Sequence, residues 1–351
     1  MSESRINGAS RPFRILSLDG GGIRGAFTAA FAAEIEKQID RPLADHFDLI
    51  AGTSTGAIIA VALALREPAE KIERLYREHG RDIFTRRPPM SVRWWKKPCI
   101  WAIDKQLRRM GLDYDGLMQS KYEAIKLKLA LAEVFGNRTL GECSTRLVIP
   151  SVDLTRGQTV VFKTPHAPFL FRDAKRLVLD ALLSTTAAPT YFPHATIESG
   201  SAYIDGGVWA NNPSMVAFAE ALKICETCQR PDLDEPFAHR DISLLAIGTG
   251  RSIYALDPPP SGAGMAWWIP RLFDITLLSQ AQGVDFQMRY VLGDRYQRAD
   301  YDIPEKGWDL DRADLVDRLT HLGRTRATDM FLDLRPMFFT GISPKFHPFT
   351  A

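Results

Sequence analysis

The pentapeptide Gly52-Thr-Ser-Thr-Gly56 is the first pattern in the chain that could do chemistry. It places Ser54 between two glycines, after the apolar run Phe47–Ala51 and before the apolar run Ala57–Leu65. A G-x-S-x-G sequence at a strand–turn–helix junction is the setting of a nucleophile elbow, in which a serine hydroxyl projects above the sheet edge. Serine is also a common N-cap of a helix. This motif alone therefore leaves a nucleophile and a structural cap as alternatives.

A glycine-rich loop, Asp19-Gly-Gly-Gly-Ile-Arg-Gly25, follows an earlier apolar run. Its glycines match the spacing G-x-G-x-x-G of dinucleotide-binding sites, but such sites expect an acidic residue at the end of the next strand, which here ends in Gly-Thr. Consecutive glycines also expose backbone N–H groups that can stabilise a developing negative charge. Arg24 would add positive charge nearby or anchor the loop to a carboxylate. An ordinary tight turn is the third alternative.

The third pattern is Tyr203-Ile-Asp205-Gly-Gly207, followed by Asn211-Asn-Pro213. Asp-Gly sequences are typical of turns, which is the structural interpretation of this segment. The functional interpretation makes Asp205 the partner of Ser54.

The elements around these motifs repeat the order strand, turn, helix, which is typical of parallel βα units with a sheet covered on both faces. The predicted strands are 13–18, 47–51, 146–153, 158–162 and 241–247, and the predicted helices are 26–39, 57–65, 174–184, 216–228 and 272–292. We therefore expect a three-layer α/β sandwich with a mostly parallel central sheet. The active site should lie at the carboxyl ends of adjacent strands.

Composition sets the broad class of the protein. Apolar types make up 45% of the 351 residues and charged types 25%, which predicts a packed core. A net charge of +2 argues against a general nucleic-acid binder. We expect one domain over residues 1–351, with a flexible N-terminus (1–12), a basic Trp-rich insertion (81–120) and a C-terminal helical and loop extension (252–351). The polar N-terminus and four cysteines predict a reduced, cytoplasmic protein.

Taken together and in order, these motifs resemble those of the patatin-like phospholipases. The segment Ser184-Thr-Thr-Ala-Ala-Pro-Thr-Tyr-Phe-Pro193 is similar to the one that precedes the catalytic aspartate in that family, and Asn211-Asn-Pro213 is similar to the one that follows it. The resemblance covers roughly residues 13 to 251. It implies hydrolysis of phospholipid acyl esters by a Ser–Asp dyad through an acyl-enzyme, without a catalytic histidine.

The resemblance also implies a role for each matching residue. Ser54 would be the nucleophile and Asp205 the base, and the N–H groups of Gly20, Gly21 and Gly22 would form the oxyanion hole. The supporting residues would be Arg24, Gly52, Gly56, Gly206 and Gly207. Neither His46 nor His194 is expected to touch the site. No metal and no cofactor are expected, and Cys225-Glu-Thr-Cys228 is interpreted as structural thiols because a lone C-x-x-C lacks half of a zinc site.

Partners follow from the same resemblance. The substrates would be membrane phospholipids, reached from the inner face of the membrane by a peripheral enzyme. Tryptophans beside cations, in Arg93-Trp-Trp-Lys-Lys97, at Trp101 and in Trp267-Trp-Ile-Pro-Arg271, suit such an interface as well as a buried core. Compact bacterial members include effectors of antiviral defence, so a cyclic dinucleotide is a candidate activator, and a homodimer is a candidate assembly. The Arg-rich stretches 289–298 and 318–326 could bind its phosphodiesters, although salt-bridged solvated helices are the simpler interpretation.

Two other functions remain as alternatives. One is a catalytically silent lipid or nucleotide sensor with the same fold, against which intact Ser54 and Asp205 argue. The other is a nucleotide-binding oxidoreductase that uses the glycine-rich loop, against which the missing acidic residue argues.

Overall fold

The structure is a computed structural model that describes residues 12–88, 101, 104–105, 119–167, 169–197, 200–227, 238–252, 261–262, 264–303, 307–344, 346 and 348–349. Most of the predicted insertion at 81–120 lies outside these residues, as do residues 1–11 of the predicted flexible N-terminus. No helix among the described residues is long and apolar enough to span a membrane.

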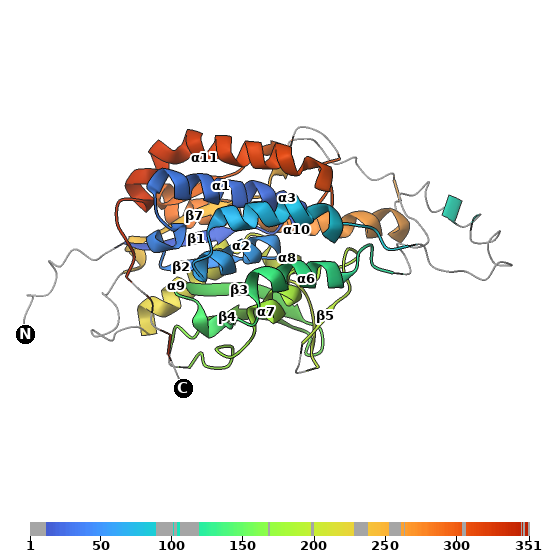
Figure 1. Ribbon diagram of the computed structural model, residues 1–351, viewed down its shortest axis with the longest axis horizontal. Coiled ribbons are helices and arrows are strands. Elements are labelled where there is room, and N and C mark those ends of the chain that lie inside the picture. Colours follow the sequence, from blue (N-terminus) through green and yellow to red (C-terminus); the bar gives the residue numbers. More distant parts are fainter. Residues whose placement is uncertain are drawn as a thin grey trace, which may run out of the picture.

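An eight-stranded sheet forms the centre of the molecule (Figure 1). Its order is β5-β6-β3-β2-β1-β7-β9, with β4 paired to β3, and neighbours from β3 to β9 run parallel. The strands are β1 (Phe13–Leu18), β2 (Leu49–Gly52), β3 (Arg146–Asp153), β4 (Gln158–Lys163), β5 (Ala195–Thr196), β6 (Ala202–Asp205), β7 (Ile242–Ile247) and β9 (Tyr296–Ala299). A separate parallel pair joins β8 (Arg251–Ser252) to β10 (Asp302–Ile303).

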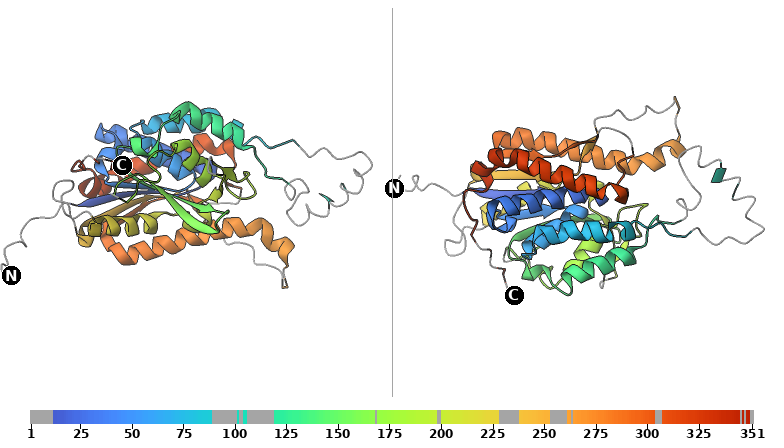
Figure 2. Two further views of the ribbon diagram at one scale, coloured as in Figure 1. Left: turned by 90° about the horizontal axis from the view of Figure 1, so that it is seen from below. Right: turned by 45° about the horizontal axis from the view of Figure 1, so that its top comes forward.

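Helices cover both faces of this sheet (Figure 2). One face carries α1 (Gly25–Ile39), α2 (Thr55–Ala64), α3 (Ala69–Ile83), α6 (Ala124–Phe135), α7 (Val178–Thr185) and α11 (Val316–Phe338). The other face carries α9 (Ser214–Thr227) and α10 (Met265–Leu292), and the short α8 (Gly207–Ala210) follows β6. The predicted three-layer α/β architecture with a mostly parallel sheet is confirmed.

Alternation along the strands builds the two cores. In β1, Leu16 and Leu18 pack into the core of the α1 face, whereas Phe13 and Ile15 pack into the core of the α9 face, and all four are fully buried. Successive side chains of a strand point to opposite faces, so a continuous apolar run is what a strand covered on both sides needs.

Some predicted boundaries differ from the structure. The predicted strand 47–51 begins two residues later, at Leu49, because 43–46 form a 3-10 turn. The predicted helix 174–184 begins at Val178, and the predicted helix 272–292 begins much earlier, at Met265. The early start carries the helix through Pro270, which lacks the N–H for a helical hydrogen bond.

The C-terminal part is integral to the packing. β9 extends the central sheet beside β7, and α11 lies along α1 (Figures 1 and 2). At Gly323 of α11 a Cβ atom would come within 3.0 Å of the Ala30 side chain, so glycine permits the close approach of the two helices.

Candidate active site

Ser54 stands at the sharp turn between β2 and α2. Its backbone φ of 51° and ψ of −122° is a strained combination for a residue with a side chain. The N–H of Ser54 donates to Oγ1 of Thr185 at 3.0 Å, and that hydroxyl donates to the Pro150 carbonyl at 2.6 Å. The side chain of Thr185 therefore holds the turn in place. The amino end of α2, directly after Ser54, favours negative charge.

Asp205 ends β6 and lies beside the serine. Strand register brings them together, because Ser151 of β3 pairs with Asp205 on one side while β2, which leads to Ser54, pairs with β3 on the other. The Ser54 hydroxyl lies beside the Asp205 carboxylate, close enough to lower its pKa by hydrogen bonding, and Gly207 N–H donates to Asp205 Oδ1 at 2.7 Å. Burial raises the pKa of Asp205 to about 7, against the lowering effect of both hydrogen bonds.

The glycine-rich loop packs directly against Ser54 and Asp205. An ordinary tight turn with no role in the site would not need to lie there. A Cβ atom on Gly20 would lie 3.3 Å from Cβ of Ser54. The prediction for Gly20 as an oxyanion donor is wrong, because its N–H donates to the Asn211 carbonyl at 3.0 Å. The N–H groups of Gly21 and Gly22 have no acceptor within the described part of the chain. Gly22 also needs its glycine backbone, with a φ of 56°.

The supporting glycines lie where chain segments cross closely. The backbone of Gly52 contacts that of Gly56, and Gly56 lies against the carbonyl of Leu18 at the end of β1. Gly206 lies against the carbonyl of Pro150, and Gly207 is in contact with the Asp205 carboxylate. All four positions thus fit the tightly packed turns that carry Ser54 and Asp205.

An apolar cavity of about 60 Å³ opens onto Ser54 and Asp205. Aliphatic and aromatic side chains make most of its wall: Ile23, Ile58, Leu75, Ile83, Phe84, Leu127, Phe192, Phe273, Leu277 and Leu310. Gly21 and Gly22 also line it, so the free N–H donors, the hydroxyl and the carboxylate meet one apolar space. This arrangement suits an ester whose acyl part is a hydrocarbon.

Comparison with known proteins places this site in a family. The patatin-like phospholipase family matches residues 16–218, which contain all three motifs. The chain belongs to the patatin-like phospholipases. Among its relatives, a protein of Pseudomonas aeruginosa named "cGAMP-activated phospholipase" is 33% identical over 87% of this chain and 83% of its own length. A protein of the same name from Vibrio cholerae is 37% identical over 70% of this chain and 66% of its own length.

Solved structures are more distant. VipD from Legionella pneumophila matches with a TM-score of 0.42 and 10% identity, over 92% of this chain and 67% of its own. This similarity is too low to support a functional argument.

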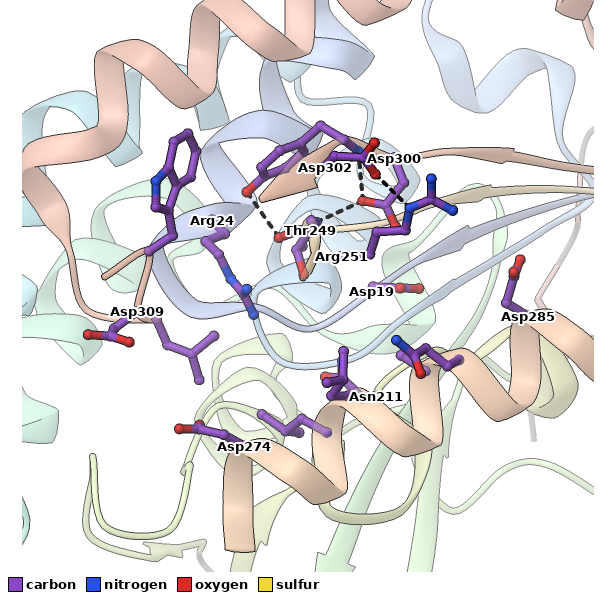
Figure 3. A pocket seen from close by; sticks show the side chains of 18 of the residues that line it. Asp19, Arg24, Asn211, Thr249, Arg251, Asp274, Asp285, Asp300, Asp302 and Asp309 are labelled. Carbon is purple, nitrogen blue, oxygen red and sulfur yellow. Dashed lines mark hydrogen bonds and ion pairs between the residues drawn. The ribbon is translucent and has the colours of Figure 1, made fainter. Parts of the chain in front are cut away.

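A second and larger space, here called the polar cleft, adjoins the site of this patatin-like phospholipase (Figure 3). It measures about 760 Å³ and is walled by α10, α11 and the ends of β1, β7 and β9. Arg24 reaches into it, and no ion pair of Arg24 occurs within the described residues; its Nε is buried without a hydrogen-bond partner. The predicted anchoring of the loop by Arg24 to a carboxylate is thus not seen.

Asp19, the first residue of the glycine-rich loop, is held by a residue from the C-terminal part of the chain. Arg298 on β9 donates to Asp19 at 2.7 Å and to Asp300 at 2.8 Å. Burial raises the pKa of Asp19 to about 6 despite this cation. Arg298 was predicted to belong to a solvated helix; it is instead on a strand, with its side chain only 11% exposed.

The histidines considered in the sequence lie away from the site, and two supporting residues were missed. His46 is buried at Gly341, His194 is exposed, and neither lines the apolar cavity. Thr185 and Thr249 were missed as supports; Thr249 Oγ1 donates to the Gly20 carbonyl at 2.7 Å. The Gly-Thr-Gly sequence at the end of β7 was the signal available for Thr249. Cys228 lies outside the described residues, within which no cluster of three metal-ligating side chains occurs.

Proposed function

We propose that this chain is a phospholipase that hydrolyses the acyl esters of membrane phospholipids through an acyl-Ser54 intermediate. The observation that carries the proposal is the position of Ser54 beside the buried Asp205, at the wall of an apolar cavity that also presents free backbone N–H groups.

In the first step, Ser54 Oγ attacks the ester carbonyl carbon while its proton passes to Asp205. A carboxylate in water is a weak base at neutral pH, but burial gives Asp205 a pKa of about 7, which suits proton transfer near neutrality. The carbonyl oxygen becomes an oxyanion and accepts hydrogen bonds from Gly21 and Gly22. One such donor contributes about 3 kcal/mol to transition-state stabilisation.

The second half of the reaction reverses the proton transfers. The tetrahedral intermediate collapses, the bond to the lipid alkoxide breaks, and protonated Asp205 gives its proton to that alkoxide. Water then attacks the acyl-enzyme and loses a proton to Asp205, and the proton returns to Ser54 as the fatty acid leaves. The chain's own residues supply every proton-transfer group in this scheme.

A lipid bilayer contact is part of the proposal. Met265, Trp268 and Leu272 have exposed fractions of 76%, 41% and 57%, and their spacing of three and four residues puts them on one face near the amino end of α10. An exposed stripe of Trp and aliphatic side chains suits the boundary between headgroups and acyl chains. The tryptophans of the predicted insertion, except the exposed Trp101, lie outside the described residues.

Regulation by a cyclic dinucleotide is also part of the proposal. Its support is the name "cGAMP-activated phospholipase" of relatives that match most of this chain.

The apolar cavity has room for only about two water molecules, so an acyl chain requires it to widen. A role in antiviral defence, and a homodimer, stay predictions from the sequence resemblance.

The first experiment is labelling with a fluorophosphonate probe, which reacts with activated serines. We expect labelling at Ser54 in the wild-type protein, located by mass spectrometry, and none in Ser54→Ala. Labelling of wild type and Ser54→Ala to the same extent would contradict the proposed nucleophile. An unlabelled wild type, with and without cGAMP, would favour the silent sensor.

A further inference from the structure

The polar cleft is built largely by residues outside the hydrolase match. The match to the patatin-like phospholipase family ends at residue 218, whereas most of the wall comes from 249–329. Its volume of about 760 Å³ is within the range of pockets that hold organic ligands. It shares Tyr191, Asn211, Leu277 and Leu310 with the apolar cavity, so the two spaces are neighbours.

The floor of the cleft holds buried polar atoms without partners. Arg298 uses one terminal nitrogen for Asp19 and Asp300, but its Nη1 has no hydrogen bond within the described chain. Oδ1 of Asp19 and Nε of Arg24 are likewise buried and unpartnered there. Buried polar groups usually have a hydrogen-bond partner. Two guanidinium groups with unused donors therefore point to an anionic ligand group at this depth.

The outer walls add cations on two different helices. Arg271 of α10 and Arg326 of α11 both line the cleft and form no ion pair among the described residues. Arg271 also lies over the ring of Trp267, with the guanidinium carbon 4.5 Å from the ring centroid, which makes a flat platform at the cleft wall. Such platforms stack nucleobases.

Free carboxylates accompany these cations. Asp309 and Asp329 line the cleft, are exposed and form no ion pair within the described part of the molecule. Figure 3 shows Asp309 and Asp274 toward the same end of the cleft as Arg24, with Asp274 on the facing helix α10. Carboxylates accept hydrogen bonds from the amino groups of base edges. A ligand with anionic phosphates and base N–H donors would satisfy both kinds of group.

We propose that the polar cleft is the binding site of the activating cyclic dinucleotide, with its phosphodiesters on the guanidinium groups of Arg24, Arg298, Arg271 and Arg326. This inference rests on the proposed function, because it locates the regulation named there. Cations on separate walls suit a ligand with two phosphates better than a lipid headgroup with one. The large volume argues the same way.

The same contacts would connect the ligand to catalysis. Arg298 holds Asp19, the first residue of the glycine-rich loop, so a phosphate on Arg298 would act directly on that loop. Leu277 of α10 lies between the two spaces and lines both. A ligand that shifts α10 outward would widen the apolar cavity and admit the acyl chain.

The test is equilibrium binding of cGAMP by calorimetry to the full chain, in wild type, Arg271→Ala, Arg326→Ala and the double variant. Both positions are at the rim, so folding should survive, and thermal unfolding checks this. The matched control is Arg335→Ala, an exposed arginine of α11 outside the cleft. Glycerophosphocholine and a mixture of GMP and AMP serve as the headgroup and monomer probes.

We expect the double variant to weaken cGAMP binding at least about tenfold, with Arg335→Ala unchanged and the headgroup and monomer probes bound far more weakly. Wild-type affinity in the double variant would place the nucleotide elsewhere and overturn the inference. Arginine-dependent binding of glycerophosphocholine without cGAMP binding would overturn it in favour of a headgroup site. Binding to Ser54→Ala protein is measured in parallel; because binding does not need hydrolysis, failure of this site and failure of the proposed activity are separate results.

Discussion

The Ser54 hydroxyl lies beside Asp205, a carboxylate that is only 3% exposed, and hydrogen bonding between them opposes the rise in the carboxylate's pKa. No histidine among the described residues stands between them, so in the proposed reaction one carboxyl group accepts and returns every proton. Burial, which raises the pKa of Asp205 to about 7, makes this demand physically reasonable.

Replacement of the base tests its role without emptying the site. Asp205→Asn keeps the shape and can still accept from Gly207 N–H, but it cannot take the Ser54 proton. We expect the rate of ester hydrolysis to fall about 10²- to 10⁴-fold, measured with a soluble fatty-acyl ester. A rate within a factor of two of wild type would exclude Asp205 as the base.

The raised pKa also makes stability depend on pH. The unfolded chain loses the Asp205 proton near pH 4, whereas the folded chain keeps it to about pH 7. The folded state thus binds more protons in this window, so the free energy of unfolding should fall as pH rises from about 4 to 7 and then level off.

Asp205→Asn should remove that component, because its side chain does not titrate. Urea denaturation at pH 5 and pH 8 measures the free energy of unfolding of both proteins. The difference between variant and wild type should shift in favour of the variant from pH 5 to pH 8. Asp19, also raised by burial, is common to both proteins and cancels in the comparison. An identical pH response of the two proteins would contradict a raised pKa at Asp205. Over the same range, wild-type hydrolysis should increase through pH 7.

The left-handed glycine of the loop offers a matched pair of variants. Gly22→Ala and Gly136→Ala place an alanine at nearly equal φ, 56° and 55°, but only the first brings a Cβ against another segment, at Leu310. The positive φ should cost each protein about 1 kcal/mol of stability, and Gly22→Ala should lose more because its Cβ would clash with the Leu310 carbonyl oxygen. Activity should fall in Gly22→Ala alone, because its N–H is a proposed oxyanion donor. Equal activity in both variants would remove Gly22 from the site.

Thr185 should matter through the position of Ser54. Thr185→Val keeps the volume but leaves Ser54 N–H and the Pro150 carbonyl without their hydroxyl partner. We expect about 1 to 3 kcal/mol lower stability and a lower kcat with little change in KM. Thr320→Val, a buried threonine of α11 that bonds only to its own helix, is the control and should leave kcat unchanged. A wild-type kcat in Thr185→Val would refute the positioning role.

The site residues predicted from the sequence were those whose signals are local. Ser54 follows the short strand β2 and Asp205 ends the short strand β6, both beside glycines, and strand register then brings them together. The supports were not predictable in this way. Arg298 meets Asp19 across 279 residues of chain, and the use of the Gly20 N–H by Asn211 is decided by tertiary packing.

The same limit applies to the fold. Strands buried on both faces were predictable from continuous apolar runs such as β1 and β7. The amphipathic α11 alternates charged and apolar side chains. The sequence pattern indicated solvated salt bridges, but it did not indicate the buried contacts of α11 with α1. The cleft between α10 and α11 follows from those contacts and so was not foreseen.

The most direct test of the central claim is fatty-acid release from phospholipid vesicles by wild type and Ser54→Ala, each with and without cGAMP. We predict release by the wild-type protein, strongest with cGAMP, and none by Ser54→Ala under either condition. Equal release by both proteins would contradict catalysis by Ser54, and no release by folded wild type with cGAMP would contradict the proposed regulated phospholipase.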